Sequence, residues 1–393
     1  MSRVHNPPHS KTLIVEGWRF LPHSYAVVNQ WQLLSLLRYP ELSIKVIDAP
    51  LYHPDWKNED GLFEPKQEQD LRAIASAQFD EAADVTFRIF ARFDFSPSRS
   101  RRTAVFATAE RQCVEKSHLR DPLMYEKFKR DGGLEEVEIV TPSRWSAEAF
   151  YNEGFSRERV HIIPHGVDLE TFYPMPDLRN DIRSDMGIHA NDFVFLNVGA
   201  ITSNKGVDLV LRAFAEIHRK FPHTRLILKG MDPLYRSDKL LDGTMSQVPL
   251  ADQERIAPRI SYFGQSFSFR EMAMLYQAAD AYVSPYRAEG FNIPVLEAAA
   301  CGVPVICTQG GATDDFVTGD FARKIASTKT AMKKGDQDLW HLNPDLEHLI
   351  ELMTAAVDDG RWRDRAARAG PAHIRAHYTW DRVTSVLVSA LFG

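Results

Sequence analysis

The sequence lacks several features that would each indicate a particular class of protein. It has three cysteines and no C-x-x-C or paired Cys/His spacing, which argues against a disulfide framework and a structural zinc site. No apolar run reaches the ~18 residues needed to span a bilayer, and the opening segment MSRVHNPPHSK lacks the apolar core of a signal peptide. We therefore expect a cytoplasmic protein with reduced thiols.

The charge balance and the lack of repeats argue against further classes. The net charge of −6 gives no reason to expect nucleic acid as a partner, and the sequence shows no solenoid repeat or low-complexity tract. The composition, with 44% hydrophobic and 25% charged residues, is that of a globular protein. A chain of 393 residues is long enough for two domains, each with its own core.

Two series of alternating strand and helix patterns divide the chain. The first opens with a strand at 12–15 and an amphipathic helix at 25–37. A segment at 52–70, rich in Pro, Asp, Glu and Lys, is long enough to be a mobile surface excursion, which we interpret as an acceptor loop. The two series predict an α/β protein with two doubly wound sheets facing one another across a ligand cleft, with domains at 1–172 and 173–378. Further strands are predicted at 44–47, 85–90, 104–107 and 137–140 in the first series, and at 194–198, 225–228, 260–263, 281–284 and 303–307 in the second.

The most informative segment places two glutamates, Glu289 and Glu297, across a strand-to-helix junction. A buried strand before it and Pro294 at the helix start put the loop at the carboxyl end of a parallel sheet, where open α/β folds bind ligands. The first amides of a helix attract phosphate, and carboxylates accept hydrogen bonds from sugar hydroxyls, so the pattern fits a nucleotide sugar. The alternative is that Glu297 only complements the helix dipole and that Glu289 is a solvated loop residue.

The same segment, AEGFNIPVLEAAACGVPVI, resembles the donor-site signature of family 4 retaining glycosyltransferases, which have the GT-B fold of two Rossmann-like domains. Other segments match that family in order from Thr141 to the C-terminus, whereas the N-terminal third matches only in outline. The resemblance implies that a last helix at 379–393 packs back on the first domain. The other matching segments are TPS at 141–143, VHIIPHGVD at 160–168, FYP at 172–174, FLNVG at 195–199, NKGVD at 204–208, YFG at 262–264, LYQAAD at 275–280 and YTW at 378–380.

This resemblance implies roles for several residues. Glu289 would contact hydroxyls of the transferred sugar, and Glu297 those of the ribose. Lys205 would neutralise the donor diphosphate as a point charge, although a surface lysine at a helix start is the alternative. The residues expected to contact the sugar or phosphate through the loop backbone are Gly290, Phe291, Asn292 and Ile293.

The chain departs from the family pattern on the phosphate side. Ala200 stands where the family usually has an arginine, so either another base completes the cationic clamp or stabilisation of the leaving group is weaker than usual. Gly17 stands where the family has a pair of glycines near the donor phosphates, although it equally fits a turn that needs a positive φ. The candidate replacement bases are Arg19, Arg287 and Lys229.

The first domain carries two further site candidates. Many family members have a histidine that contacts the transferred sugar after the strand at 104–107. This chain offers Glu110 there, either for that contact or as a helix-start carboxylate. His118 is a lone histidine nearby and is more often structural than catalytic.

Two charged segments have alternative interpretations. Asp336 and Asp338 have the D-x-D spacing that other glycosyltransferases use for a divalent ion, but they lie in a polar stretch, 329–338, without a flanking strand, which argues against a metal site. A basic region in the first domain fits either a solvated face or a contact with a membrane surface or an anionic acceptor. Its members are Arg99, Arg101, Arg102, Lys116, Arg120, Lys127, Lys129 and Arg130.

By resemblance, we expect a retaining glycosyltransferase that moves a sugar from a nucleotide-diphosphate donor to an acceptor hydroxyl, without a metal or other cofactor. The acceptor would be a glycan, a lipid-linked molecule or a small molecule. The alternative is a GT-B protein that binds a nucleotide or glycan without transfer, because Ala200 and the absent histidine weaken the site. A sugar phosphorylase of related fold ranks below both, since no lysine is recognisably placed to anchor pyridoxal phosphate.

Overall fold

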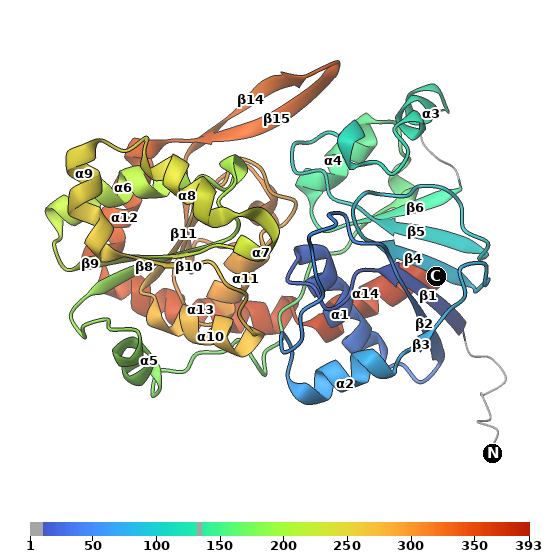
Figure 1. Ribbon diagram of the computed structural model, residues 1–393, viewed down its shortest axis with the longest axis horizontal. Coiled ribbons are helices and arrows are strands. Elements are labelled where there is room, and N and C mark those ends of the chain that lie inside the picture. Colours follow the sequence, from blue (N-terminus) through green and yellow to red (C-terminus); the bar gives the residue numbers. More distant parts are fainter. Residues whose placement is uncertain (1–10, 132–135) are drawn as a thin grey trace. The chain divides into compact units, whose positions relative to one another are not determined.

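The computed structural model describes residues 11–131 and 136–393 and divides into two compact units. Unit 1 comprises Met1–His165 together with Trp380–Gly393, and unit 2 comprises Gly166–Thr379. The division at His165 falls a few residues before the boundary expected from the sequence. Each unit is an α/β layer structure built on its own parallel sheet, so the α/β fold class predicted from the sequence is confirmed (Figure 1).

The sheet of unit 1 has seven strands, and every neighbouring pair is parallel. Its central strands are apolar because a parallel sheet is covered on both faces. The polar exceptions are paired: in β4 the buried Arg88 Nε donates to Glu16 Oε2 of β1 at 2.9 Å. In spatial order the strands are β3 (Ala75–Ser76), β2 (Leu42–Asp48), β1 (Lys11–Gly17), β4 (Val85–Ile89), β5 (Arg102–Phe106), β6 (Val137–Thr141) and β7 (Val160–Ile162).

The C-terminal helix belongs to unit 1. Arg38, next to the end of α1, pairs with Asp381 of the last helix at 2.8 Å, and the Trp31 and Trp380 rings stack with centroids 6.5 Å apart. The last helix of the chain thus packs against a helix near its start. The helices of unit 1 are α1 (Ser24–Leu36), α2 (Pro65–Ala73), η1 (Lys116–His118), α3 (Leu123–Asp131), α4 (Arg144–Asn152), η2 (Arg157–Arg159) and α14 (Trp380–Phe392).

The sheet of unit 2 has six parallel strands, and its order reverses between β8 and β11. At such a reversal, the segments that follow the two neighbouring strands run to opposite faces of the sheet. A crevice therefore opens at the carboxyl ends of these strands. The segments that follow β8 and β11 therefore meet at the same edge. In spatial order the strands are β10 (Ile260–Phe263), β9 (Thr224–Lys229), β8 (Phe193–Val198), β11 (Ala281–Ser284), β12 (Val305–Thr308) and β13 (Ala322–Ile325).

Helices cover both faces of the unit 2 sheet, with α6, α8, α9 and α12 on one side and α5, α10 and α13 on the other (Figure 1). Across the described residues, no helix is both long and apolar enough to cross a membrane. The helices are α5 (Arg179–Asp185), η3 (Ser203–Lys205), α6 (Val207–Lys220), α7 (Asp232–Tyr235), α8 (Ser237–Met245), α9 (Leu250–Ile256), η4 (Ala257–Arg259), α10 (Phe269–Ala278), α11 (Ile293–Ala300), η5 (Ala312–Asp315), α12 (Leu346–Asp358) and α13 (Gly360–His377).

A β-hairpin corrects one expectation from the sequence. The polar stretch 329–338 is not free of strands: β14 (Ser327–Lys334) and β15 (Gln337–Pro344) form an antiparallel pair in unit 2 (Figure 1). Gly335, with φ = 64°, lies in the tight turn between them. The first strand is polar and mostly exposed, so it lacks the apolar alternation by which strands are recognised. Leu342 N in the second strand donates to Arg287 O at 2.8 Å, which joins the hairpin to the loop after β11.

Candidate functional site

The loop between β11 and α11 holds most of the predicted donor-site residues. Asn292, directly before the helix, has φ = 78° and ψ = 66°, a left-handed conformation that asparagine tolerates better than most residues. Its Nδ2 donates to Ser284 Oγ at 2.9 Å and so ties the end of the loop to the end of β11. Helix α11 therefore starts at the carboxyl edge of the sheet, with Pro294 in its first turn. The first amides of a helix have no partner within it, and they suit an anion.

Lys205 and Glu289 meet although 84 residues separate them in sequence. Lys205 Nζ lies 2.5 Å from Glu289 Oε1, and the two side chains are 25% and 8% exposed. The sequence placed Lys205 at the start of a helix; in the structure it ends η3, and α6 begins two residues later at Val207. The structure thus brings together a cation and a carboxylate at the point where the strand order reverses.

The two loops that carry this pair are bound to each other. Arg287 makes two hydrogen bonds of 2.7 Å to the carboxylate of Asp208 in α6, and its N–H donates to Asn204 O at 2.7 Å. Gly206 has φ = 71°, and a Cβ there would lie 2.0 Å from the carbonyl oxygen of Pro285. The position therefore needs glycine, because the loops pack backbone to backbone.

Glu297 lies in the second turn of α11 and is buried. Its Oε2 accepts a hydrogen bond of 2.7 Å from the hydroxyl of Tyr276 in α10. Burial raises the pKa of Glu297 to about 7, because the charged form is poorly solvated there. The pKa of Tyr282 is likewise raised, first by burial and then by the charges of Glu289 and Glu297. Both carboxylates therefore lie within electrostatic reach of one phenol.

The raised pKa of Glu297 predicts a pH-dependent stability. The folded protein holds this proton more tightly than the unfolded chain, whose glutamate has a pKa of 4.5, so stability falls as the pH rises from 4.5 to about 7. Glu297→Gln removes that loss. We expect the variant's stability relative to wild type to increase by about 2 to 3 kcal/mol from pH 5 to pH 8, measured by urea unfolding of both proteins. A stability difference that does not change with pH would contradict the assignment.

The remaining loop residues contribute backbone rather than side chain. The Phe291 ring is buried and stacks on Phe316 with centroids 4.7 Å apart, which fixes it in the core of unit 2. Gly290 is also buried, and Ile293 is the first residue of α11. The predicted backbone contacts of these residues with a donor remain predictions.

Two of the three candidates for the missing arginine are held by carboxylates. Arg287 binds Asp208, as described above, and also donates to Ser203 O at 2.9 Å. Arg19, in unit 1, makes bonds of 2.8 and 2.7 Å to Asp48 and one of 2.7 Å to Leu71 O. Both arginines hold loops in place, which sequence alone could not distinguish from a role at a phosphate.

Gly17 is needed for close packing rather than for a turn. It ends β1 and does not have a positive φ, so the expectation of a left-handed turn is wrong. A Cβ at this position would lie 2.7 Å from Asn29 Nδ2 and 2.8 Å from Ile89 O. The glycine lets α1 and the end of β4 approach the end of β1.

Glu110 and His118 belong to unit 1, whereas Lys205, Glu289 and Glu297 belong to unit 2. Glu110 lies in a turn after β5, and its carbonyl oxygen accepts a bond of 2.7 Å from Trp145 Nε1. His118 ends η1, where its ring meets Phe93 edge-on at 6.2 Å and its carbonyl accepts the Phe93 N–H at 2.7 Å. These contacts favour a structural role for His118.

An aromatic cluster at the carboxyl edge of the unit 1 sheet was not predicted. The Trp18 ring, directly after β1, lies 5.7 Å from Trp56 and 5.0 Å from His23. Tyr52 is 44% exposed, and the Arg92 guanidinium lies 5.0 Å from its ring centroid. The aromatic residues of the segment 52–70 could have indicated this cluster. The segment was interpreted as an acceptor loop from its polar composition and length. The cluster consists of Trp18, His23, Tyr25, Tyr52, His53 and Trp56.

Several residues of the basic region form ion pairs with carboxylates. Arg102 binds Glu138 at 2.7 Å, and Arg120 binds Asp94 at 2.8 Å. Lys116 lies 3.3 Å from Glu126. These pairs favour a solvated surface over a membrane contact. The side chains of Lys129 and Arg130 lie outside the described residues.

The D-x-D pair lies at the tip of the β14–β15 hairpin. Asp336 is in the turn, and Asp338 pairs with Lys333 at 3.7 Å. Within the described ranges, no group of three or more His, Cys, Asp or Glu side chains is arranged to hold a metal ion.

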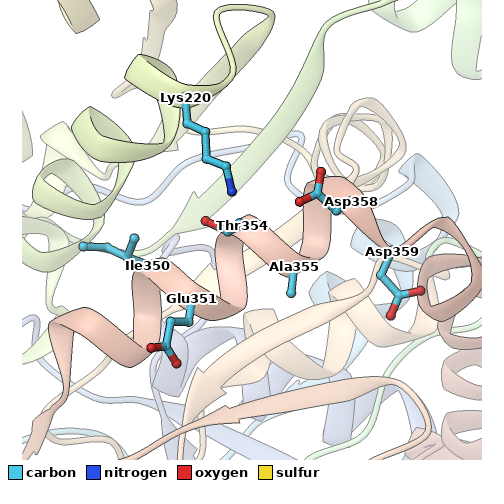
Figure 2. Close-up of a pocket in the computed structure, with 7 residues that line it drawn as sticks. All are labelled: Lys220, Ile350, Glu351, Thr354, Ala355, Asp358 and Asp359. Atoms are coloured by element: carbon cyan, nitrogen blue, oxygen red, sulfur yellow. The ribbon is translucent and has the colours of Figure 1, made fainter.

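A groove lies elsewhere in unit 2, between the end of α6 and α12. Figure 2 shows Lys220 reaching toward α12, with Glu351 and Asp358 along that helix. Asp359 at its end is engaged with Arg323 at 2.7 Å. Lys220 ends α6 at the edge of the sheet away from Lys205, so this groove is separate from the candidate site.

Comparisons with known proteins show what the chain is similar to. Residues 192–333 match the family model described as glycosyl transferases group 1, and this range contains Lys205, Glu289 and Glu297. The likeness to solved structures given below shows that the chain has the GT-B fold. It is similar to D-inositol 3-phosphate glycosyltransferase 1 of Catenulispora acidiphila, with 28% identity over 61% of this chain and 54% of that relative. With the Mycobacterium bovis D-inositol 3-phosphate glycosyltransferase it shares 29% identity over 64% of this chain and 47% of the relative.

The chain spans about half the length of these curated relatives. Solved GT-B structures cover nearly all of it: HepE of Anabaena in complex with UDP and glucose has a TM-score of 0.69 at 14% identity, covering 97% of this chain and 99% of HepE. A Rickettsia africae glycosyltransferase has a TM-score of 0.70 at 12% identity, covering 98% and 99%. At these identities the likeness shows the fold alone.

Proposed function

We propose that this GT-B protein transfers a sugar from a nucleotide-diphosphate donor to an acceptor hydroxyl, with retention of anomeric configuration and without a metal ion. The observation that carries this proposal is the contact of Lys205 with Glu289 beside the start of α11. A cation and a carboxylate suit, in turn, a diphosphate and sugar hydroxyls, and the start of a helix favours a phosphate oxygen. The buried Glu297 would accept hydrogen bonds from the ribose.

The reaction needs one bond exchange at the anomeric carbon. The bond from that carbon to the β-phosphate oxygen breaks, and a bond to the acceptor oxygen forms on the same face of the sugar. The acceptor proton passes to the departing phosphate oxygen, so no separate protein base is required. Lys205 would stabilise the charge that develops on the diphosphate, and Glu289 would orient the sugar through its hydroxyls.

The aromatic cluster of unit 1 supports a carbohydrate acceptor. It lies at the carboxyl ends of β1 and β2, the edge where open α/β sheets bind ligands. The C–H faces of sugar rings suit the negative face of an aromatic ring, and the Tyr52 ring is exposed. The named relatives act on inositol 3-phosphate, a ring with several hydroxyls, which fits the same class of acceptor.

Tyr52→Ala tests the acceptor surface. We expect the acceptor KM to rise roughly 3- to 10-fold, with slow hydrolysis of the donor unchanged, because one stacking contact is lost and the donor site is intact. Steady-state kinetics with varied acceptor measure this. Phe79→Ala is the matched control, since Phe79 is 81% exposed in the same unit and lies outside the cluster. Equal effects of the two variants would contradict the assignment.

A thermal-shift screen with UDP-, GDP- and ADP-sugars tests the donor site. A ligand that binds the native state raises the apparent melting temperature. We expect at least one sugar nucleotide to raise it in wild type, and Glu297→Ala to lose most of the shift. Glu351→Ala, in the groove of Figure 2, should retain the shift. If no sugar nucleotide shifts the wild type, or if Glu297→Ala responds like wild type, the proposed donor site is wrong.

A further inference from the structure

The strand order of the unit 1 sheet reverses between β1 and β4. Open α/β sheets bind ligands at the carboxyl ends of the strands beside such a reversal. Trp18 directly follows β1, Tyr52 comes after the end of β2, and Arg92 comes after the end of β4. The topology of unit 1 therefore marks the edge that carries the aromatic cluster and Arg92 as a position for a ligand.

The buried members of the aromatic cluster support an exposed one. Trp18 and Trp56 are buried, and their rings meet edge-on with centroids 5.7 Å apart. Trp18 Nε1 donates to Pro50 O at 2.9 Å, which joins the segment after β1 to the segment after β2. The Tyr52 ring centroid lies 5.9 Å from that of Trp56, and Tyr52 is exposed. Packing thus holds one aromatic ring at the surface of this edge.

Arg92 lies beside that exposed ring, with its guanidinium 5.0 Å from the Tyr52 ring centroid. In the part of the chain that the structure describes, no ion pair or hydrogen bond engages the N–H groups of Arg92. Arg19, near the end of β1, is by contrast bound by two hydrogen bonds to the carboxylate of Asp48. Arg92 therefore brings to this edge a positive charge that none of the described carboxylates neutralises.

A guanidinium beside an aromatic ring keeps its hydrogen-bond donors available. The contact with the ring uses the positive charge, whereas the N–H groups form a planar fork at the edge of the guanidinium. That fork matches a carboxylate or a phosphate through two parallel hydrogen bonds. The Tyr52 ring offers an aromatic face to the C–H groups of a sugar. A sugar with an acidic group suits both side chains at once, because they are in contact with each other.

We propose that the aromatic cluster and Arg92 bind an acceptor that carries a negative charge, namely a sugar with a carboxylate or a phosphate group. The inference rests on the proposed function, because it concerns the acceptor of that reaction. Arg92 is then a specificity-determining residue: its fork binds the anionic group while the sugar ring packs on Tyr52. The carboxylate and the phosphate share this chemistry, and the measurements below distinguish them.

Binding of matched sugars tests this assignment without turnover. The probes are glucose, galactose and mannose, each compared with its uronate and its 6-phosphate, added to protein saturated with whichever of UDP, GDP and ADP binds best. By NMR titration, we expect at least one uronate or phosphate to bind wild type about 10- to 100-fold more tightly than its neutral parent. The uronate and phosphate arms show which anion the site prefers. Added salt should weaken the binding of the charged sugar more than that of the neutral one.

Arg92→Met should abolish the preference for the charged sugar and leave the affinity for the neutral parent unchanged. Arg157→Met is the matched control, because the Arg157 guanidinium lies 4.1 Å from the Tyr151 ring centroid in the same unit and outside the cluster. Both arginines are exposed, so we expect the two variants to have similar melting temperatures. Arg157→Met should bind every sugar as wild type does.

Three results would overturn the proposal: equal affinity of wild type for charged and neutral sugars, a preference that survives Arg92→Met, or equal losses in the two arginine variants. The titrations contain a nucleoside diphosphate and no sugar nucleotide, so they do not depend on transfer. A preference that requires Arg92 in a protein that transfers no sugar would contradict the proposed function alone. Transfer to neutral and charged sugars with equal efficiency would contradict this inference alone.

Discussion

Lys205→Ala is expected to lower kcat by roughly 100- to 1000-fold, because one donor to the developing charge of the leaving group is lost. The variant also removes the cation that contacts Glu289 Oε1 at 2.5 Å. Initial rates of nucleotide release at saturating donor measure the effect.

The control for this prediction is Lys220→Ala. Lys220 is an exposed lysine at the other end of α6, about 20 Å from the helix start by helical rise. It should leave kcat unchanged. If Lys205→Ala raised only the donor KM and left kcat intact, Lys205 would bind the ground state and the transition state equally, and its proposed catalytic role would be wrong.

Gly206→Ala is expected to disrupt the site through the backbone. The added Cβ would lie 2.0 Å from Pro285 O, at a residue with φ = 71°, so either the η3 turn or the loop before Arg287 must move. We expect the free energy of unfolding to fall by about 2 to 4 kcal/mol, from the strained φ and the backbone clash together. Turnover should fall by more than 10-fold, since Lys205 and Glu289 lie on the two displaced loops. Urea unfolding and steady-state kinetics test the two parts.

Gly243→Ala provides a control of opposite sign. Gly243 lies within α8, and nothing is within 4 Å of the position a Cβ would take. Alanine favours a helix interior by about 0.5 to 1 kcal/mol, so this variant should be slightly more stable and fully active. If Gly206→Ala behaved like Gly243→Ala, the close approach of the two loops would not be needed for the site.

The fold could be predicted where burial leaves a mark on the sequence. Strands covered on both faces are continuous apolar runs, and the segments at 194–198 and 281–284 were identified for that reason. β13 was missed because Arg323 and Lys324 interrupt its apolar pattern, and β14 was missed because it is polar. β13 pairs with the buried strand β12, and β14 pairs with the adjacent β15, so both are held by backbone pairing that an apolar pattern does not reveal.

The donor half of the site could be predicted from the expected strand order as well as from the types of residue. Lys205 and Glu289 come after β8 and β11, and such neighbours at a reversal of strand order bring the segments that follow them together. The sequence did not show which residues pair with the candidate bases. Only the structure shows that Arg287 is held by Asp208 and that Lys229 lies beside Gly199. Charge alone could not separate a loop support from a ligand contact.

The most direct measurement for the central claim is product formation with a panel of sugar nucleotides and carbohydrate acceptors. We predict that wild type releases the nucleoside diphosphate when an acceptor is present, and that the new glycosidic bond keeps the donor's anomeric configuration by NMR. Lys205→Ala should show little release under the same conditions. A protein that binds the sugar nucleotide but releases no nucleotide with any acceptor would contradict the account, and would instead be a GT-B protein that binds without transfer.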